Sequence, residues 1–300
     1  MEKIILWGCG NVGRKAYEKL FDSYEIVAYA DNDSYKQNLI YKGIPIVGFE
    51  ELKNSYLNCK VIITMEDYYD EAKWLSENDI SVIGYYDIVQ EKILPWKRIN
   101  WEDIKDKKIC LYAGDIYENF EYYPDDRVIC LSLSKSNYRT IKHDITLPYP
   151  LEDESIDSYQ IEDVIEHIAE DKVLQVINEI YRILKKGGYL RLSLPDYNSQ
   201  MLINRSFMDK SGKLIFDPYG GGNYIRGKVC NGGHLWFPTY ELVSEILKQS
   251  NFQDYKFYRY HDKDRTFYSE RIDYKMGYIS RTKEHSFYRK DVSIVVDCFK

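Results

Sequence analysis

The chain has 300 residues, of which 44% are hydrophobic and 30% are charged, and its formal net charge is −7. This composition is typical of a globular protein, and the acidic balance argues against nucleic acid or an anionic membrane surface as its main partner. No apolar run approaches the roughly 20 residues of a membrane span. The first residues, MEKIILWGCGNVG, enter a strand pattern without a signal-peptide arrangement, so we expect a cytoplasmic protein.

Residues 3–90 alternate between strand and helix patterns. Strands are predicted at 3–8, 25–31, 60–65 and 81–85, and helices at 13–21 and 70–79. Such alternation predicts a parallel sheet with both faces covered. The pattern breaks at 91–105, which contains Pro95 and mixed charge. We therefore predict a first domain over 1–92, a linker over 93–105 and a second domain over 106–300.

Three glycines follow the first predicted strand. Gly8, Gly10 and Gly13 have the G-x-G-x-x-G spacing of a phosphate-binding loop, and Asp31 follows the second strand, where an acid can bind a ribose. This favours a nucleotide or nucleotide-sugar as ligand. In the alternative reading, the glycines serve close packing of helix on strand and Asp31 forms a turn. An NAD-dependent sugar oxidoreductase is a third option, although 90 residues leave no room for a separate substrate domain.

The run EIVAYADNDSYKQNLIYKGIPIVGFEEL resembles the Rossmann-like N-terminal domain of bacterial glycan-biosynthesis enzymes. The likeness covers about residues 1–90. In such proteins the domain is linked with nucleotide-sugar recognition or has no known role, so the resemblance implies one of these two.

The alternation of strands and helices restarts at residue 108. Strands are predicted at 108–114, 127–133, 155–163, 189–196, 254–260 and 292–299, with helices at 171–188 and 239–252. In the helix over 171–188 the apolar residues recur at helical spacing, and Gly187 and Gly188 are predicted to end it, with two lysines beside its negative dipole end. Residues between 197 and 238 are irregular and glycine-rich.

Two runs, IKHDITLPYPLEDESIDSYQIEDVIEHI and VINEIYRILKKGGYLRLSLPDY, resemble class I S-adenosylmethionine-dependent methyltransferases. The resemblance covers about residues 105–300. It implies an α/β protein of two doubly wound Rossmann-like domains, the second with the class I methyltransferase fold and S-adenosylmethionine as cofactor. Combined with the N-terminal likeness, it implies methyl transfer to a sugar or sugar-linked acceptor in polysaccharide biosynthesis.

The resemblance assigns roles to several residues. Asp144 is expected to accept from the adenine amino group, or else to form a turn, and Glu162 ends the next strand on the cofactor side. His167 is our first candidate for the base that deprotonates the acceptor, because a neutral imidazole suits that task near pH 7. His234, between glycines and an apolar run, is the second candidate. Asp196 either points toward the substrate or caps a turn.

The sequence departs from the family at the cofactor loop. After the strand over 108–114 the family has a G-x-G loop, whereas this chain has YAGD, in which only Gly114 matches and Asp115 follows. The next strand ends in Ser132, where the family has an acid for the ribose hydroxyls. The alternative function is therefore a catalytically degenerate methyltransferase fold that binds a nucleotide-sugar or a partner protein. A homo-oligomer is compatible with either function.

Six cysteines are scattered along the chain without a C-x-x-C pair: Cys9, Cys59, Cys110, Cys130, Cys230 and Cys298. Several lie in apolar strand patterns. Buried free thiols in a reducing compartment fit this distribution better than disulfides or a zinc site, so we expect no metal centre.

Overall fold

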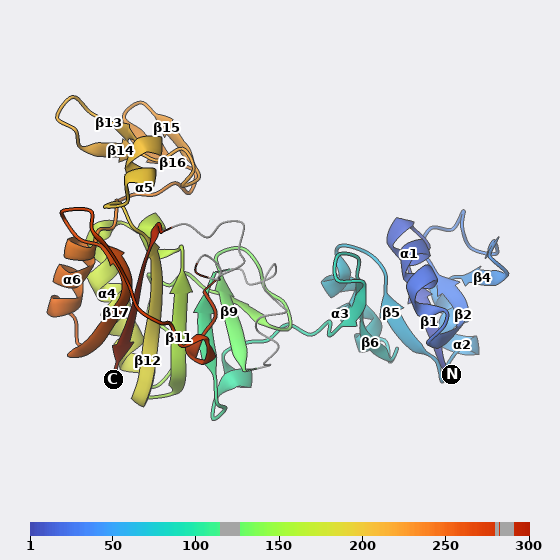
Figure 1. Ribbon diagram of the computed structural model, residues 1–300. Coiled ribbons are helices and arrows are strands. Elements are labelled where there is room, and N and C mark those ends of the chain that lie inside the picture. Colours follow the sequence, from blue (N-terminus) through green and yellow to red (C-terminus); the bar gives the residue numbers. More distant parts are fainter. Residues whose placement is uncertain (115–126, 280–281, 283–290) are drawn as a thin grey trace. The chain divides into compact units, whose positions relative to one another are not determined.

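The computed structural model describes residues 1–114, 127–279, 282 and 291–300, and the chain divides into two compact units, 1–98 and 99–300 (Figure 1). Each unit is described by itself below. The residues predicted as a linker, 93–105, are shared between the units. Lys92–Leu94 forms the last strand of the first sheet, and Ile104 is buried in the core of the second unit.

The first unit is a seven-stranded sheet with the order β3-β4-β2-β1-β5-β6-β7. Its strands are β1 (Glu2–Trp7), β2 (Tyr24–Ala30), β3 (Ile40–Tyr41), β4 (Ile44–Val47), β5 (Lys60–Ile63), β6 (Val82–Asp87) and β7 (Lys92–Leu94). The five inner strands are parallel, and β3 and β7 pair antiparallel at the two edges.

Helices cover both faces of this first sheet. They are α1 (Asn11–Leu20), α2 (Phe49–Ser55) and α3 (Tyr68–Glu77). Because side chains alternate along a strand, Leu6 of β1 joins Ala16 of α1 in one core cluster, while Trp7 meets Phe49 and Trp74 on the other face. The sheet is therefore doubly wound, as predicted.

The second unit is an eight-stranded sheet with the order β10-β9-β8-β11-β12-β19-β17-β18. Its strands are β8 (Cys110–Ala113), β9 (Val128–Ser132), β10 (Thr140–Lys142), β11 (Ile156–Glu162), β12 (Leu184–Pro195), β17 (Asp254–His261), β18 (Phe267–Ser269) and β19 (Ser293–Phe299). Strands β8 to β12 are parallel, and β19 lies antiparallel between β12 and β17. A parallel sheet with a reversed last strand inserted beside the fifth is the class I methyltransferase fold.

Helices α4 (Glu170–Ile183) and α6 (Tyr240–Gln249) pack against one face of the second sheet (Figure 1). The opposite face is covered by residues 272–279, which include the 3-10 turn η4 (Tyr274–Met276). Gln160 donates to the carbonyl of Tyr278, and Arg191 donates to the carbonyl of Asp273. These side chains alternate with apolar ones that face the helices, so this sheet also buries both faces.

The predicted end of the helix over 171–188 is wrong. Helix α4 ends at Ile183, and β12 begins at Leu184, which pairs with Ile156 of β11. Gly188 lies within β12, where a Cβ would be 2.8 Å from the carbonyl oxygen of Asp157, so glycine is required at this position. Lys185 forms an ion pair of 3.0 Å with the Asp157 carboxylate instead of lying at the helix dipole. Pairing with the neighbouring strand therefore outweighs the local helix signal.

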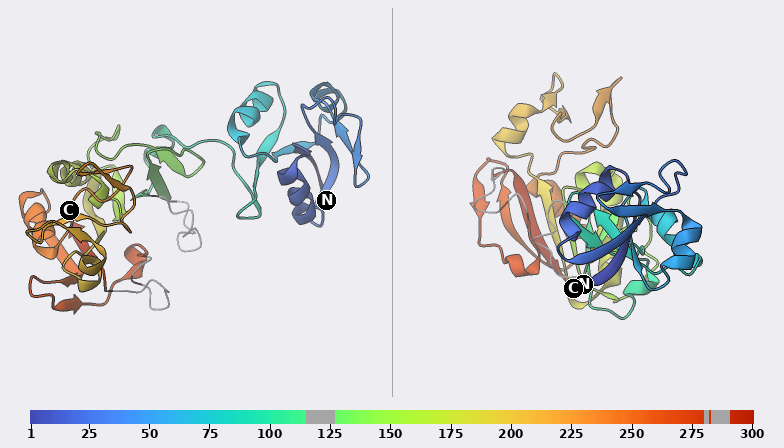
Figure 2. Two further views of the ribbon diagram at one scale, coloured as in Figure 1. Left: turned by 90° about the horizontal axis from the view of Figure 1, so that it is seen from above. Right: turned by 90° about the vertical axis from the view of Figure 1, so that its right-hand side faces the viewer.

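The glycine-rich stretch after β12 forms a small subdomain, residues 200–230. It consists of α5 (Gln200–Arg205) and two hairpins, β13 (Phe207–Met208) with β14 (Leu214–Phe216), and β15 (Asn223–Ile225) with β16 (Lys228–Cys230). The subdomain lies beyond the carboxyl end of β12 in both Figure 1 and the right view of Figure 2. It therefore stands at the end of the sheet where ligands bind in α/β folds.

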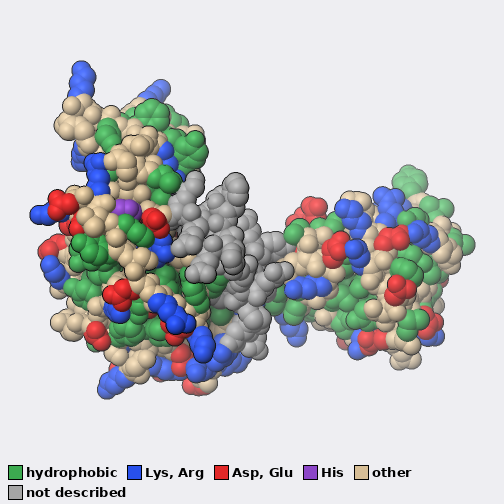
Figure 3. All heavy atoms as spheres, viewed as in Figure 1, with side chains coloured by type: hydrophobic (Ala, Val, Ile, Leu, Met, Phe, Trp, Pro, Cys, Tyr) green, Lys and Arg blue, Asp and Glu red, His purple; other side chains and the backbone are tan. Residues whose placement is uncertain are grey.

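Figure 3 shows side chains of both charge signs interspersed over each unit on the face in view. Among the helices that the structure describes, none is long and apolar enough to cross a membrane.

Candidate functional site

Four predicted cofactor residues lie at one edge of the second sheet. Gly114 follows β8, Ser132 ends β9, Asp144 follows β10 by two residues and Glu162 ends β11. Because these strands are parallel and adjacent, their carboxyl ends form a single edge. This is the position at which α/β folds bind nucleotide-containing ligands.

Gly114 has a backbone that favours glycine. Its φ is +124°, and its N–H donates to the carbonyl of Leu131 at 3.1 Å. A Cβ at this position would lie 3.2 Å from the ring of Tyr112. The single glycine of the YAGD run is thus required by the turn itself. Asp115 lies outside the described residues.

Ser132 and Glu162 have different surroundings. The hydroxyl of Ser132 accepts long hydrogen bonds from the N–H groups of Ser134 and Lys135, at 3.4 and 3.3 Å, so it shapes the turn after β9. Glu162 is buried, and its carboxylate lies 3.4 Å from the hydroxyl of Tyr112. The carboxylate at this edge is therefore supplied by β11, not by β9.

Asp144 forms a turn and still offers an acceptor. Its Oδ1 accepts from the N–H of Thr146 at 2.9 Å and from the Thr146 hydroxyl at 2.8 Å. The N–H bond is the main reason that the pKa of Asp144 lies below its usual value, so the group is ionised near neutral pH. Both bonds go to Oδ1, and Oδ2 can accept from a ligand.

Both histidine candidates meet just beyond this edge. His167 belongs to the 3-10 turn η3 (Ile165–His167) directly after β11, and His234 comes from the loop before α6. Their ring centroids are 4.8 Å apart with the planes at 78°. The loop is held by two hydrogen bonds: the N–H of Leu235 donates to the carbonyl of Glu166 at 2.8 Å, and the indole of Trp236 donates to the carbonyl of Ile165 at 3.0 Å.

Glu166 completes this group. Its side chain is 0% exposed, and its Oε1 lies 3.6 Å from Nε2 of His234 and 4.0 Å from Nε2 of His167. The available signal was the Glu-His pair after a strand that ends in acids. The sequence could not indicate that His234, 67 positions after His167 in the chain, would face the same carboxylate.

A chain of hydrogen bonds orients His234 from behind. Nδ1 of His234 is 2.5 Å from the hydroxyl of Tyr197, which donates to Asp217 at 2.7 Å. Arg205 of α5 donates to the same Asp217 carboxylate. Because the tyrosine proton goes to Asp217, we assign the remaining proton to Nδ1 of His234. Its Nε2 then presents a lone pair toward Glu166.

The small subdomain supports this arrangement. A Cβ added to Gly220 would lie 2.7 Å from the His234 ring, so the ring packs directly on glycine backbone. Burial, together with the bond to Asp217, keeps the pKa of Tyr197 well above its usual value. Nothing in the sequence indicated Tyr197, Asp217 or Arg205, because they lie in different elements.

Asp196 has a structural role. Its carboxylate is fully buried and accepts from the N–H of Asn198 at 3.1 Å and from both the N–H and Nδ1 of His261, at 2.6 and 2.8 Å. The turn-capping alternative is therefore the correct one for this residue.

The three glycines of the first unit have different surroundings. Gly8 has a φ of +111°, and a Cβ at Gly13 would lie 1.9 Å from the carbonyl oxygen of Gly8, whereas no atom lies within 4 Å of a Cβ at Gly10. Asp31 accepts from the N–H groups of Cys9 and Asp33, at 2.9 and 3.0 Å. Packing thus explains Gly13 and turn formation explains Asp31, while Gly10 faces open space.

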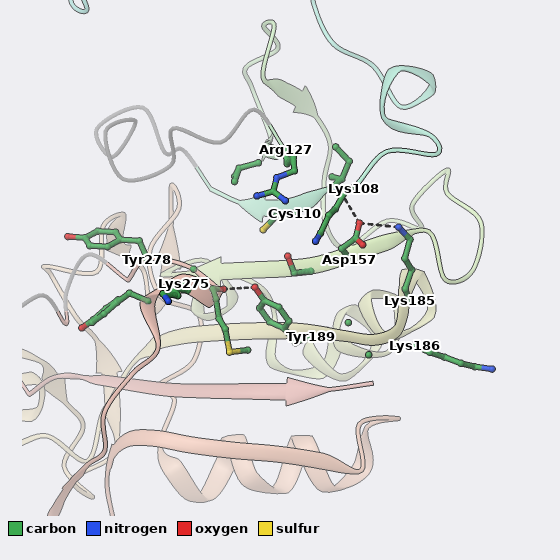
Figure 4. Close-up of a pocket in the computed structure, with 17 residues that line it drawn as sticks. Lys108, Cys110, Arg127, Asp157, Lys185, Lys186, Tyr189, Lys275 and Tyr278 are labelled. Atoms are coloured by element: carbon green, nitrogen blue, oxygen red, sulfur yellow. Dashed lines mark hydrogen bonds and ion pairs between the residues drawn. The ribbon is translucent and has the colours of Figure 1, made fainter.

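A separate cavity of about 490 Å³ lies at the opposite ends of β8, β11 and β12 (Figure 4). Its basic side chains come from Lys108, Arg127, Lys185, Lys186 and Lys275. Asp157 within it accepts from the N–H of Ile109 and from Lys185. Because this cavity is at the amino ends of the parallel strands, it is distinct from the edge that carries Gly114, Asp144 and Glu162.

Comparisons with known proteins agree with the two-unit division. Residues 113–192 match a family model described as a methyltransferase domain, and residues 1–88 match one described as C2185-like, N-terminal. The first match extends from the last residue of β8 into β12 and includes Asp144, Glu166 and His167. This part of the chain is therefore similar to methyltransferase domains.

Similar proteins include O-methyltransferase 3 of Dictyostelium discoideum, which is 30% identical over 103 residues, 34% of this chain and 22% of that protein. The chain thus spans about a fifth of the length of that relative. A SAM-dependent methyltransferase from Archaeoglobus fulgidus matches 66% of this chain and 88% of its own at 15% identity, with a TM-score of 0.41. UDP-D-quinovosamine 4-dehydrogenase from Vibrio fischeri matches 34% of this chain and 96% of its own at 19% identity, with a TM-score of 0.27.

Proposed function

We propose that the second unit transfers a methyl group from S-adenosylmethionine to a hydroxyl or amino group of a sugar or sugar-linked acceptor in bacterial surface-glycan biosynthesis. The observation that carries this proposal is the pair His167 and His234 beside Glu166, one turn beyond the sheet edge that holds Gly114, Asp144 and Glu162. The edge proposed to bind the donor and two side chains that could accept a proton are thus adjacent.

The chemistry is a direct displacement at the methyl carbon. The acceptor oxygen or nitrogen forms a bond to that carbon, the carbon–sulfur bond breaks, and its electron pair remains on sulfur as S-adenosylhomocysteine. Much of the rate in such a reaction comes from holding donor and acceptor in line. The acceptor must also lose a proton, and His167, whose side chain is 32% exposed, is the more accessible of the two imidazoles.

We also propose which residues would bind the donor. Oδ2 of Asp144 would accept from the exocyclic amino group of adenine, and the Glu162 carboxylate would accept from the ribose hydroxyls in place of the acid that the family has at Ser132. The turn at Gly114 lets the methionine part of the cofactor approach the backbone.

For the first unit we propose binding of a nucleotide or nucleotide-sugar at residues 8–13. The open space around Gly10, at the start of α1, supports this because a phosphate could approach the backbone there. The proposal that the acceptor contains a sugar rests on this loop and on the resemblance to glycan-biosynthesis enzymes.

Calorimetric titration of S-adenosylmethionine and S-adenosylhomocysteine tests the donor site. We expect saturable binding by the whole chain, a loss of at least about tenfold in affinity for Asp144→Ala, and a smaller loss for Asp144→Asn, whose single side-chain oxygen can accept either from Thr146 or from adenine, but not from both. Methyl transfer from labelled donor to a panel of nucleotide-sugars then identifies the acceptor. Absence of binding at millimolar ligand would leave the degenerate fold, a binding module without transfer, as the function.

A further inference from the structure

Three side chains with metal-binding atoms converge beside the donor edge. One ligand atom from each of Glu166, His167 and His234 can be chosen so that all three lie within 4.8 Å of one another. Among the described residues this is the one group of three such side chains. We propose that it binds a divalent transition-metal ion, of the class of Zn²⁺ or Mn²⁺, with open positions for the acceptor.

The separations suit an intervening ion. His234 Nε2 and His167 Nε2 lie 3.6 and 4.0 Å from Glu166 Oε1, beyond the 2.7–3.2 Å that is typical of a hydrogen bond. Around a tetrahedral ion with bonds of about 2.0–2.2 Å, neighbouring ligand atoms are about 3.3–3.6 Å apart. The two separations are therefore close to those of a tetrahedral site.

Burial and charge favour a cation at this point. Glu166 is 0% exposed and His234 is 5% exposed, so an ion held between these side chains would be largely shielded from solvent. The buried Nδ1 of His167 has no hydrogen-bond partner among the described residues, so no hydrogen bond from this atom opposes a small rotation of the ring toward an ion. His167 is the partly exposed member, so the open coordination positions would lie on its side.

The surroundings of His234 are those of a positioned ligand. Its Nδ1 is bonded to Tyr197, which Asp217 and Arg205 hold in place, and this fixes the ring with Nε2 toward Glu166. A hydrogen bond from the non-ligating nitrogen orients the imidazole in metal sites and raises its basicity. The expectation of no metal centre was drawn from the cysteines, and these three residues are a different donor set.

Two imidazoles and one carboxylate favour zinc, manganese, iron or cobalt over calcium or magnesium. Methyl transfer involves no change of redox state, so a Lewis acid is sufficient. An acceptor hydroxyl on the ion would lose its proton to solvent water more readily, and its oxygen would then attack the methyl carbon. This role rests on the proposed function, and it makes His167 a ligand and not a base.

The open positions also indicate the acceptor class. Three protein ligands leave one to three positions on such an ion, and two adjacent sugar hydroxyls, or a hydroxyl beside a carboxylate, would fill two of them as a chelate. We therefore infer that the acceptor presents two neighbouring oxygen atoms. A sugar that lacks the second oxygen would bind the ion more weakly.

The test is titration of Co²⁺, Zn²⁺, Mn²⁺ and Mg²⁺ into chelator-treated whole chain, followed by calorimetry and by the visible absorption of Co²⁺. We expect one ion per chain, with Mg²⁺ the weakest. Glu166→Gln and His167→Ala should each weaken Co²⁺ binding by at least about tenfold and alter its spectrum, and Tyr197→Phe should weaken it by about 10–100-fold. Glu170→Gln, an exposed neighbour of the same charge, should change neither.

Circular dichroism identifies variants that fail to fold. If Glu166→Gln unfolds, His167→Ala remains the deciding variant because its side chain is partly exposed. Absence of saturable binding of all four ions, or equal binding by His167→Ala and the wild type, would overturn the proposal.

The titration contains no S-adenosylmethionine, so the two proposals fail separately. Co²⁺ binding without donor binding would retain the metal site and remove the methyltransferase. If the chain binds the donor and transfers methyl groups after chelation but does not bind Co²⁺, the methyltransferase is retained and the metal site is removed.

Discussion

Gly13 and Gly10 lie in the same loop of the first unit, but the structure constrains them differently. A Cβ at Gly13 would lie 1.9 Å from backbone oxygen, so helix α1 can only approach β1 with glycine there. Gly10 has a φ of −86°, which any residue adopts, and open space beside it. One glycine therefore serves packing, and the other is available for a ligand.

We expect Gly13→Ala to destabilise the protein by about 1–3 kcal/mol, because the added methyl group overpacks the strand-to-helix turn. Gly10→Ala should change the free energy of unfolding by less than about 1 kcal/mol. Urea unfolding measures both. In the same preparations, Gly10→Ala should lose nucleotide-sugar binding while it keeps its fold. Unchanged binding by this variant would restrict the loop to a structural role.

At the scale of elements, β12 and β19 are joined by a buried ion pair. Arg191 and Asp297 lie opposite each other in the antiparallel pairing, and both nitrogen–oxygen distances are 2.7 Å. Both side chains are fully buried, and Arg191 also donates to the carbonyls of Asp273 and Gly277. One side chain thus connects the reversed last strand to the segment that covers the sheet.

Asp297→Asn should therefore destabilise the second unit by about 3–5 kcal/mol, since it leaves the Arg191 charge buried without its counter-ion. Glu270→Gln is the control, because Glu270 forms an ion pair with Lys256 in which both side chains are exposed, 61% and 50%. Its loss should cost less than about 1 kcal/mol. Thermal and urea unfolding compare the two variants. Similar losses in the free energy of unfolding for the two variants would contradict the stabilising role of the buried ion pair.

At the scale of the whole molecule, carboxylates with lowered pKa values occur in both units. In the first unit, burial alone would raise the pKa of Asp31, but hydrogen bonds from Asp33 and Cys9 and the ion pair with Lys36 lower it. In the second unit, the hydrogen bond from Arg182 lowers the pKa of Glu179. These groups favour the folded state when ionised.

Stability should consequently fall as the pH is lowered. A carboxyl with a depressed pKa contributes stability above its unfolded value, about 3.9 for Asp and 4.3 for Glu, and this is lost as the pH falls through the folded value. Asp196 acts in the opposite direction, because burial raises its pKa. Urea midpoints between pH 7 and pH 3 should decrease, and less steeply for Glu179→Gln. An identical slope in that variant would contradict the assignment of Glu179.

The order of elements could be predicted from the sequence because hydrophobic periodicity is a local property. The strands that end in Gly114, Ser132 and Glu162 were identified in this way, and since parallel strands share an edge, so was the side of the sheet where a cofactor would bind. The turn at Gly114 was also foreseeable, because only glycine adopts its backbone conformation without strain. Local reasoning failed at Leu184, where pairing with Ile156 turns an apparent helix end into strand.

Only the tertiary structure decided which side chains share a site. Glu166 and His167 are adjacent in the chain, but His234 reaches them because Leu235 and Trp236 bond to the backbone of η3. The bonds that orient His234 likewise join elements that are separated by tens of residues. Such contacts depend on long-range packing, which periodicity does not encode. The sequence by itself therefore determined the fold and the edge at which a donor would bind, whereas packing determined the three-residue cluster and with it the proposed metal ion.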